Sequence, residues 1–285
     1  MSEVRNPNLG LICAEVRRQI LDVTHATASP HLGSCFSCVE ALVALYFSEL
    51  QVTAETLQAA HRDRFFLSKG HACLALYTVL NKKGFLPDEV YKRYGISGGT
   101  LEHHQKRNPA WGIESSGGSL GHGLSLAAGA AWTMKLDASI ARSFVLLSDG
   151  ELNEGSSWEA VLFAAQHKLD NLIALVDYNK IQALGRCEEV LGLEPLGKKF
   201  EAFGWAVSEV QGNDVNAVVK SLKATASIRG KPQVLILHTF KGQGVSFMRD
   251  TLLWHYRCPD EKELAAARQE IDAQIAECAA QGGCA

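Results

Sequence analysis

Two polar side chains, Asp149 and Asn179, each follow an apolar run that predicts a buried strand. Residues 143–147 (SFVLL) precede Asp149, and residues 172–176 (LIALV) precede Asn179. If the two strands pair in parallel, both side chains emerge side by side at the edge of the sheet where the strands end. One carboxylate oxygen and one amide oxygen suit Mg²⁺, which commonly also binds substrate phosphates. A simpler hypothesis fits the same spacing: Asp149 caps a helix and Asn179 occupies a turn.

A glycine-rich segment is a second feature suited to phosphate. Residues 117–123 (GGSLGHG) open a predicted helix. A helix N-terminus attracts anions, and glycines let the backbone approach them closely. The segment does not match the P-loop pattern, because no GK[ST] follows, nor does it match GxGxxG after a first strand. Many glycine-rich turns bind nothing, so this segment alone is a weak indication.

Several histidines lie in predicted turns or at helix starts rather than on apolar helix faces. They are His31, His71, His103, His104 and His255. A single histidine of this kind is more often structural than catalytic. Several of them in a chain with a candidate Mg²⁺–phosphate site favour chemistry, because imidazole can donate to phosphate or carbonyl oxygens and moves protons near neutral pH.

The elements that must position these residues alternate along the chain. Predicted strands cover 65–67, 143–147, 172–176, 206–210 and 234–237. Predicted helices cover 9–26, 38–50, 71–82, 120–134, 155–166, 215–226 and 260–280. This order predicts an α/β fold, with a mostly parallel sheet and helices on both faces, in a single domain over residues 1–285. The irregular segment 91–118 is long for a compact domain, which is typical of a functional loop.

Composition excludes several classes of protein. The chain has 285 residues, 47% hydrophobic and 21% charged, which excludes disordered, collagen-like and coiled-coil proteins. Its 28 Lys and Arg against 31 Asp and Glu give a net charge of −3, so we expect no nucleic-acid partner and no membrane. The eight cysteines are scattered, and the start MSEVRNPNLG carries no apolar signal segment. We therefore expect reduced thiols in a cytoplasmic protein.

Segments along nearly the whole chain resemble transketolases, in the same order. Asp149-Gly150, with Asn179 thirty positions beyond the aspartate, is similar to the thiamine diphosphate motif. Further similar segments are SPHLGS around His31, FLSKGHA around His71, LEHH around His104, GGSLGHGLS at 117–125, SSWEA at 156–160, DNLIALVDYNKIQ at 170–182 and TFKGQGVSFM with WH at 239–255. The match is to the N-terminal, diphosphate-binding third of the family. The chain thus resembles the small subunit of a split transketolase, with the thiamine diphosphate-binding fold.

The resemblance implies roles for individual positions. Asp149 and Asn179 would bind Mg²⁺, or another divalent cation such as Ca²⁺ or Mn²⁺, by side chain, and Ile181 by its carbonyl. Thiamine diphosphate would contact His71, Gly118, Ser119, Leu120, Gly150, Asn179 and His255. Catalytic roles would fall to His31, His104 and His255 near the ketose, and to Glu154 in an acidic network that links paired active sites. The cofactor carries the difficult bond making, and protein groups supply orientation, proton transfer and electrostatics.

The resemblance also implies a transferase that moves a two-carbon ketol unit from a sugar or sugar phosphate to an aldose, and that needs a partner. In this family the glutamate beside the aminopyrimidine ring belongs to the pyrimidine-binding domain. We expect that domain, and the C-terminal domain, on a second subunit in a heterotetramer. An apolar patch near 119–134 and 155–166 would fit such an assembly. The alternatives are another thiamine enzyme subunit (deoxyxylulose phosphate synthase-like or 2-oxoacid dehydrogenase α-like) and a non-catalytic half that binds a partner.

Four positions depart from the family pattern. Ser148 replaces the first glycine of the GDG turn, and its small size predicts that the turn survives. His103 replaces a glycine and Gln105 replaces a proline, on either side of His104. These two changes leave the cofactor assignment intact but keep the sugar open, including branched, deoxy or sulfonated sugars. His122 replaces a common glutamine, which we interpret as neutral.

Overall fold

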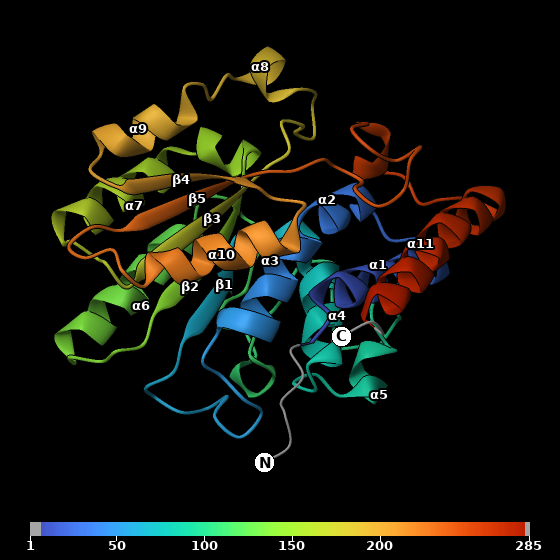
Figure 1. Ribbon diagram of the computed structural model, residues 1–285, viewed down its shortest axis with the longest axis horizontal. Coiled ribbons are helices and arrows are strands. Elements are labelled where there is room, and N and C mark those ends of the chain that lie inside the picture. The colour runs from blue at the N-terminus through green and yellow to red at the C-terminus, as the bar shows by residue number, and fades with distance from the viewer. Residues whose placement is uncertain (1–6, 283–285) are drawn as a thin grey trace.

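One sheet of five parallel strands forms the centre of the computed structural model, which describes residues 7–282 (Figure 1). The strands are β1 (Arg64–Leu67), β2 (Ser143–Ser148), β3 (Leu172–Tyr178), β4 (Ala206–Gln211) and β5 (Gln233–His238). Their spatial order is β1-β2-β3-β5-β4, and each neighbouring pair is parallel. The predicted α/β fold with a parallel sheet is confirmed. Parallel pairing requires crossover connections, which the helices provide.

Helices cover both faces of the sheet. On one face lie α1 (Leu9–Thr27), α3 (Val39–Ala44), α4 (Cys73–Lys82) and α10 (Val215–Thr225). On the other lie α6 (Gly123–Leu136), α7 (Gly155–Gln166) and α9 (Leu196–Ala202). The remaining helices are α2 (Leu32–Ser37), α5 (Asp88–Tyr91), α8 (Cys187–Val190) and α11 (Glu261–Gly282).

The central strands β2 and β3 are buried along their whole length because each face of the sheet has its own core. In β2, Phe144 and Leu146 join the core beneath α1, α3, α4 and α10. Val145 and Leu147 join the core beneath α6, α7 and α9. Successive side chains of a strand point to opposite faces, so burial on both faces produces a continuous apolar run.

Several helices begin or end differently from the sequence prediction. The predicted helix 38–50 is α3 followed by a π-helical turn at Leu45–Glu49. The helix expected from residue 71 begins at Cys73, after the 3-10 turn Gly70–Ala72, and α6 begins at Gly123 rather than at residue 120. In the last two cases the residues before the helix are drawn into loops at the sheet edge; the Gly123 N–H, for example, donates to Ser68 Oγ at 3.0 Å.

The C-terminal helix α11 lies along α1 (Figure 1). The sequence predicted a surface helix over 260–280, but Leu264, Ala267 and Ile271 are buried and belong to the first core. Arg268 also pairs with Asp22 of α1 at 2.8 Å. The helix is therefore an integral layer of the fold.

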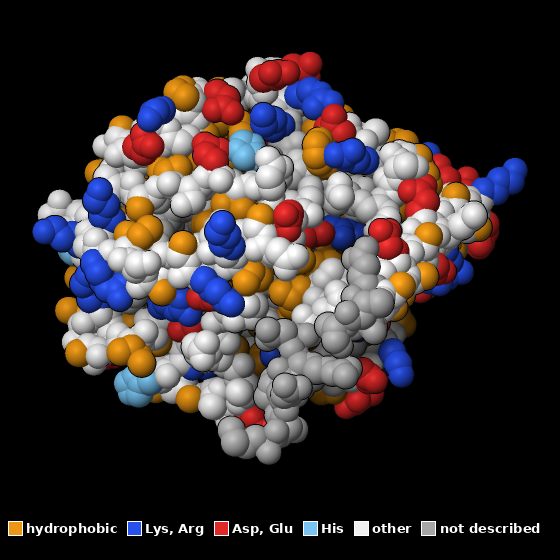
Figure 2. Space-filling model, in the orientation of Figure 1, with side chains coloured by type: hydrophobic (Ala, Val, Ile, Leu, Met, Phe, Trp, Pro, Cys, Tyr) orange, Lys and Arg blue, Asp and Glu red, His pale blue; other side chains and the backbone are white. Residues whose placement is uncertain are grey.

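The molecular surface carries charges of both signs. On the face shown in Figure 2, Lys and Arg side chains alternate with Asp and Glu side chains, without one continuous basic area. Among residues 7–282, no helix has both the length and the apolar character needed to cross a membrane.

Candidate active site

A cavity of about 190 Å³ lies at the edge of the sheet where the strands end. The loops that follow β1, β2, β3 and β5 reach it. Its lining includes these predicted site residues: His31, His71, Gly118, Leu120, Asp149, Gly150, Asn179, Ile181 and His255. A larger cavity of about 530 Å³ lies near the opposite edge, beside Arg142 and Gln233, and its lining includes none of them. The smaller cavity is therefore the candidate active site, because parallel sheets bind ligands outside the carboxyl ends of their strands.

Asp149 and Asn179 lie at adjacent strand ends, as the sequence predicted. Ser148 of β2 lies opposite Asp177 of β3 in the register. Asp149 Oδ2 accepts a hydrogen bond from the Lys180 N–H at 2.6 Å, so the carboxylate reaches the turn that carries Asn179. The simpler structural hypothesis is also met, because Asp149 Oδ1 accepts from the Gly150 N–H at 2.7 Å and caps the short turn Gly150–Asn153.

The donor set at these strand ends suits a hard divalent cation. Burial, and then the nearby Asp177 carboxylate, raise the pKa of Asp149 to about 6. A cation would offset both effects. Within residues 7–282 no cluster of three or more His, Cys, Asp and Glu side chains is arranged to hold a metal. One carboxylate, the Asn179 amide oxygen and the Ile181 carbonyl form a different set, of oxygen atoms only, which Mg²⁺ would complete with water and phosphate oxygens.

The cavity wall also has unpaired polar atoms and a closely packed glycine turn. The hydroxyls of Ser34 and Ser148 are buried without a hydrogen-bond partner, and both residues line the cavity. Gly118 has φ of +122°, a conformation that side chains rarely adopt, and a Cβ on Gly70 would lie 2.6 Å from the Gly118 nitrogen. Backbone and hydroxyl groups are thus presented to a ligand, which fits the diphosphate of a cofactor.

Four histidines from distant parts of the chain gather at this cavity. The ring centroid of His31 lies 5.5 Å from that of His71, 5.1 Å from that of His255 and 6.1 Å from that of His104. The backbone of His31 has a positive φ of 71°, and its N–H donates to the His255 carbonyl at 2.9 Å. Strained backbone of this kind often marks functional positions.

Burial keeps the imidazoles of His31, His71 and His255 neutral. Burial, and then the neighbouring His104 and the Lys241 ammonium, lower the pKa of His31 to about 4. Burial and the Lys241 ammonium lower the pKa of His255 to about 3. The His71 pKa is lowered as well, by burial and by Lys69. Neutral imidazoles can donate at one nitrogen and accept at the other.

Lys241 is a site residue that the sequence interpretation missed. Its ammonium lies 2.8 Å from His255 Nδ1 and donates to the Ile181 carbonyl at 3.0 Å. Because an ammonium can only donate, the proton of neutral His255 must sit on Nε2. Burial and the neighbouring Lys69 lower the Lys241 pKa to about 8. The only sequence signal was its place in the quoted segment TFKGQG.

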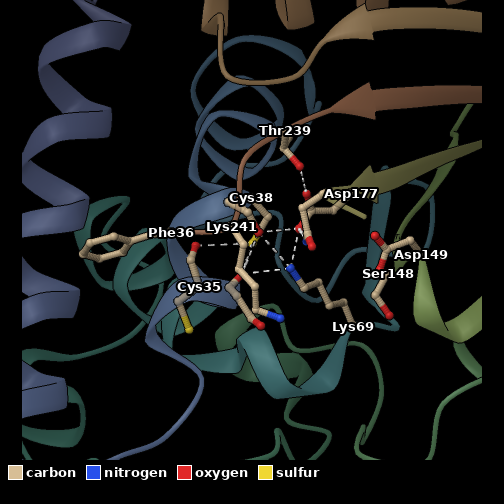
Figure 3. Close-up of polar contacts among 12 residues, drawn as sticks. Cys35, Phe36, Cys38, Lys69, Ser148, Asp149, Asp177, Thr239 and Lys241 are labelled. Atoms are coloured by element: carbon tan, nitrogen blue, oxygen red, sulfur yellow. Dashed lines mark hydrogen bonds and ion pairs between the residues drawn. The ribbon is translucent and has the colours of Figure 1, made fainter. Parts of the chain in front are cut away.

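A buried ion pair, also missed, lies behind the cavity. In Figure 3 the Lys69 side chain extends toward Asp177, and Thr239 lies on the other side of that carboxylate. The Lys69 and Asp177 side chains are 1% and 0% exposed. Burial disfavours both charges, yet the Asp177 carboxylate raises the pKa of Lys69, and the ammonium lowers that of Asp177. Asp177 also accepts from the Asn179 amide at 3.4 Å, so the pair supports a predicted metal ligand.

Three predicted residues lie outside the cavity lining. Glu154 and Ser119 are exposed, and Glu154 precedes the first turn of α7. His104 is exposed too, although its ring lies beside His31. The buried acid near Glu154 is Glu151, which accepts from the Gly121 N–H at 2.8 Å. Of the departing positions, Ser148 ends β2 and the turn after it is intact, and His122 is exposed.

Comparison with known proteins identifies the family of this chain. Residues 11–277 match the family described as transketolase, thiamine diphosphate binding domain. The chain belongs to the transketolase family. It is 38% identical over 259 residues to one of the apulose-4-phosphate transketolase subunits of Phocaeicola vulgatus, covering 91% of this chain and 92% of that one. It is 36% identical over 257 residues to the 6-deoxy-6-sulfo-D-fructose transketolase subunit SqwG of a Clostridium species, covering 90% and 94%.

Longer transketolases match over part of their length only. The human transketolase is 35% identical over 261 residues, which are 91% of this chain but 41% of the human one. The structure of the Campylobacter jejuni transketolase superposes with a TM-score of 0.84 at 25% identity, covering 96% of this chain and 46% of that one. The predicted identity, a thiamine diphosphate-binding transketolase subunit that works with a partner, is confirmed.

Proposed function

We propose that this transketolase subunit uses thiamine diphosphate and Mg²⁺ to move a two-carbon ketol unit from a ketose to an aldose at the cavity described above. The observation that carries the proposal is the meeting of Asp149 and Asn179 with His31 and His255 around one cavity. When bound, thiamine diphosphate supplies carbon–carbon bond chemistry that protein side chains lack. The chain itself binds, orients and moves protons.

The metal would be held by Asp149, Asn179 and the Ile181 carbonyl, with Ca²⁺ or Mn²⁺ as substitutes for Mg²⁺. The Ile181 carbonyl accepts from Lys241 at 3.0 Å. The Lys241 ammonium lines the same cavity and would be a donor for the diphosphate. The remaining cofactor contacts would come from His71, Gly118, Ser119, Leu120, Gly150 and His255.

Sugar handling falls to His31, His104 and His255. Because Lys241 directs the proton of His255 to Nε2, this imidazole would present an N–H donor to a ligand oxygen. The lowered pKa of His31 keeps its imidazole uncharged and able to accept a hydrogen bond from a sugar hydroxyl. Positioned acid–base groups of this kind typically contribute about 10²–10⁴-fold to a rate.

A partner subunit would complete the site. We assign to it the pyrimidine-binding domain, the glutamate that activates the cofactor, and the C-terminal domain, while residues 1–285 form one diphosphate-binding domain. Exposed apolar side chains on α6 and α7, such as Leu126 (49% exposed) and Leu162 (58%), support a heterotetramer of two small and two large subunits. Glu154, near these helices, would then connect paired sites. The free thiols of the described residues support a cytoplasmic enzyme.

The ketose substrate would carry an anionic terminal group. The two relatives are named for apulose 4-phosphate and 6-deoxy-6-sulfofructose, one a phosphate and the other a sulfonate. The cavity lysines Lys69 and Lys241 are engaged with internal partners, so the terminal anion would be bound by the partner subunit. Assaying the reconstituted pair with apulose 4-phosphate, 6-deoxy-6-sulfofructose, fructose 6-phosphate and pyruvate tests this. Turnover of pyruvate, with no turnover of the three sugars, would favour 2-oxoacid chemistry instead.

The metal and cofactor roles are tested with Asp149→Ala in the complex of both subunits. We expect loss of Mg²⁺-dependent thiamine diphosphate binding, measured by calorimetry, together with loss of ketol transfer. Asp137→Ala is the matched control, because Asp137 is exposed at the end of α6. Cofactor binding that survives in the Asp149 variant contradicts the proposal. So does full ketol transfer by the 285-residue chain without a partner, given only thiamine diphosphate and Mg²⁺.

A further inference from the structure

The loop segment that carries His104 is fastened to the glycine turn by its neighbour Gln105. The Gln105 carbonyl accepts from the Gly117 N–H at 2.8 Å. The Gln105 side-chain amide donates to the Leu67 carbonyl, at the end of β1, at 2.7 Å. Gln105 is 1% exposed although both neighbours in sequence are exposed. It is therefore a buried anchor of this stretch of loop, next to His104 in the sequence.

The packing between the two segments is close. A Cβ on Gly117 would lie 2.3 Å from Gln105 Nε2, and a Cβ on Gly118 would lie 3.3 Å from the ring of His104. Residues 104 and 105 thus cover residues 117 and 118 pairwise. A shift of the Gln105 side chain would move the His104 ring relative to both the glycine turn and His31.

His104 lacks an anchor of its own. Within residues 7–282 its side chain forms no hydrogen bond, and its one ring contact is the 6.1 Å approach to His31. Gln105 Oε1 is buried without a hydrogen-bond partner among the described residues, whereas its NH₂ group donates to the Leu67 carbonyl. What the amide adds is a directional bond to the end of β1.

We propose that Gln105 is a positioning residue, which acts through His104 by holding that imidazole at the sugar-binding end of the cavity. The proposal rests on the function proposed above, in which His104 contacts the ketose. Small displacements of a contacting group can lower a rate by about 10²-fold.

The test is a double-mutant cycle in the two-subunit enzyme with thiamine diphosphate and Mg²⁺, using fructose 6-phosphate and apulose 4-phosphate as probes. Gln105→Met keeps the length of the side chain but cannot bond to Leu67. We expect His104→Ala to lower kcat/KM about 100-fold and Gln105→Met about 10-fold. The double variant should match His104→Ala within about 3-fold, because contacting groups are non-additive.

Controls separate positioning from folding. Lys106→Ala changes an exposed neighbour that pairs only with Glu102, and should leave kcat/KM within about 2-fold. The thiamine diphosphate concentration that gives half-maximal activity should change less than about 3-fold in Gln105→Met, because the hydrogen bond between the position-105 carbonyl and the Gly117 N–H remains. If the methionine variant does not fold, as judged by circular dichroism, Gln105→Ala replaces it.

The outcomes are distinguishable. Unchanged kcat/KM in Gln105→Met, or losses in the double variant that multiply, overturn the positioning role while the proposed function stands. Unchanged kcat/KM in His104→Ala would show that His104 does not contact the sugar. Both the role assigned to His104 and the positioning role of Gln105 would then be wrong.

Discussion

The buried pair of Lys69 and Asp177 offers a direct test of how the site is held together. Asp177→Asn preserves the shape of the side chain and removes its charge. Every group around the carboxylate donates to it: Lys69 Nζ, Ser37 Oγ at 2.6 Å, Thr239 Oγ1 and the Asn179 amide at 3.4 Å. An amide NH₂ group turned toward Lys69 and Asn179 would face donors that cannot accept, whereas one turned toward the Thr239 hydroxyl could be satisfied, so the main loss is the charge that compensates Lys69.

The magnitude follows from burial. Lys69 keeps only neutral partners in this variant, the Ser34 carbonyl at 2.8 Å and Ser37 Oγ at 3.1 Å. Leaving a buried charge uncompensated costs about 3–5 kcal/mol, a large part of the 5–15 kcal/mol that stabilises a typical domain. Lys69→Met should cost a similar amount, because Asp177 then loses its ion-pair partner. The double variant should be more stable than the sum of the two losses predicts by at least about 1.5 kcal/mol.

Urea unfolding of the chain, followed by circular dichroism, measures all three variants. The reasoning is refuted if the two single losses add in the double variant, or if Asp177→Asn costs less than about 1 kcal/mol. Arg186→Met, which breaks an exposed pair with Asp250, is the matched control and should cost less than about 1 kcal/mol.

Three further outcomes are expected. First, the pKa of His31 is about 4 in the folded chain and near 6.5 in the unfolded chain, so the unfolded state binds more protons between these pH values. Stability should therefore fall as the pH drops from about 6.5 to about 4. In urea titrations of His31→Gln, the unfolding free energy should depend less steeply on pH over this range. Second, EDTA should lower the melting temperature of the thiamine diphosphate-loaded complex, because a ligand at a hundredfold excess over its Kd stabilises the folded state by about 2.7 kcal/mol. This decrease in melting temperature should be absent in Asp149→Ala, and equal decreases in both proteins would contradict the metal assignment. Third, Gly118→Ala, at φ +122°, should cost about 1–2 kcal/mol and weaken cofactor binding by calorimetry, whereas unchanged affinity would exclude this turn from the site.

The sheet and the central pair of site residues can be predicted from the sequence for one physical reason. Burial on both faces turns β2 and β3 into uninterrupted apolar runs, so their ends are visible in the sequence. Parallel pairing then brings Asp149 and Asn179 together whatever the side chains elsewhere do. The helix starts near the site were less predictable, because contacts across the sheet edge, rather than helix propensity, determine the conformation of residues 70–72 and 120–122.

The residues that sequence reasoning missed depend on where side chains point. Lys69, Asp177 and Lys241 come from the ends of three different strands, and nothing in their local sequence distinguishes an internal ion pair from a solvated charge. Gln105 looks like a polar loop residue until its 1% exposure and its bond to β1 are known. Such contacts join segments tens of residues apart, so they follow from the register and twist of the sheet.

The electrostatics of the cavity favour a ligand that carries both charges. Burial raises the pKa of Asp149 toward neutrality and lowers that of Lys241. The charged form of each group is therefore disfavoured by burial and only partly compensated by an opposite charge. A divalent cation alone would stabilise Asp149 but repel Lys241, and a diphosphate alone would do the reverse. A metal–diphosphate unit would offset both penalties at once, because the Ile181 carbonyl is an acceptor suited to the cation and the Lys241 ammonium is a donor suited to the diphosphate. The uncharged histidines add no repulsion to either part. The arrangement of charges therefore suits the charged end of the cofactor as a unit, independently of the sugar that the partner subunit helps to select.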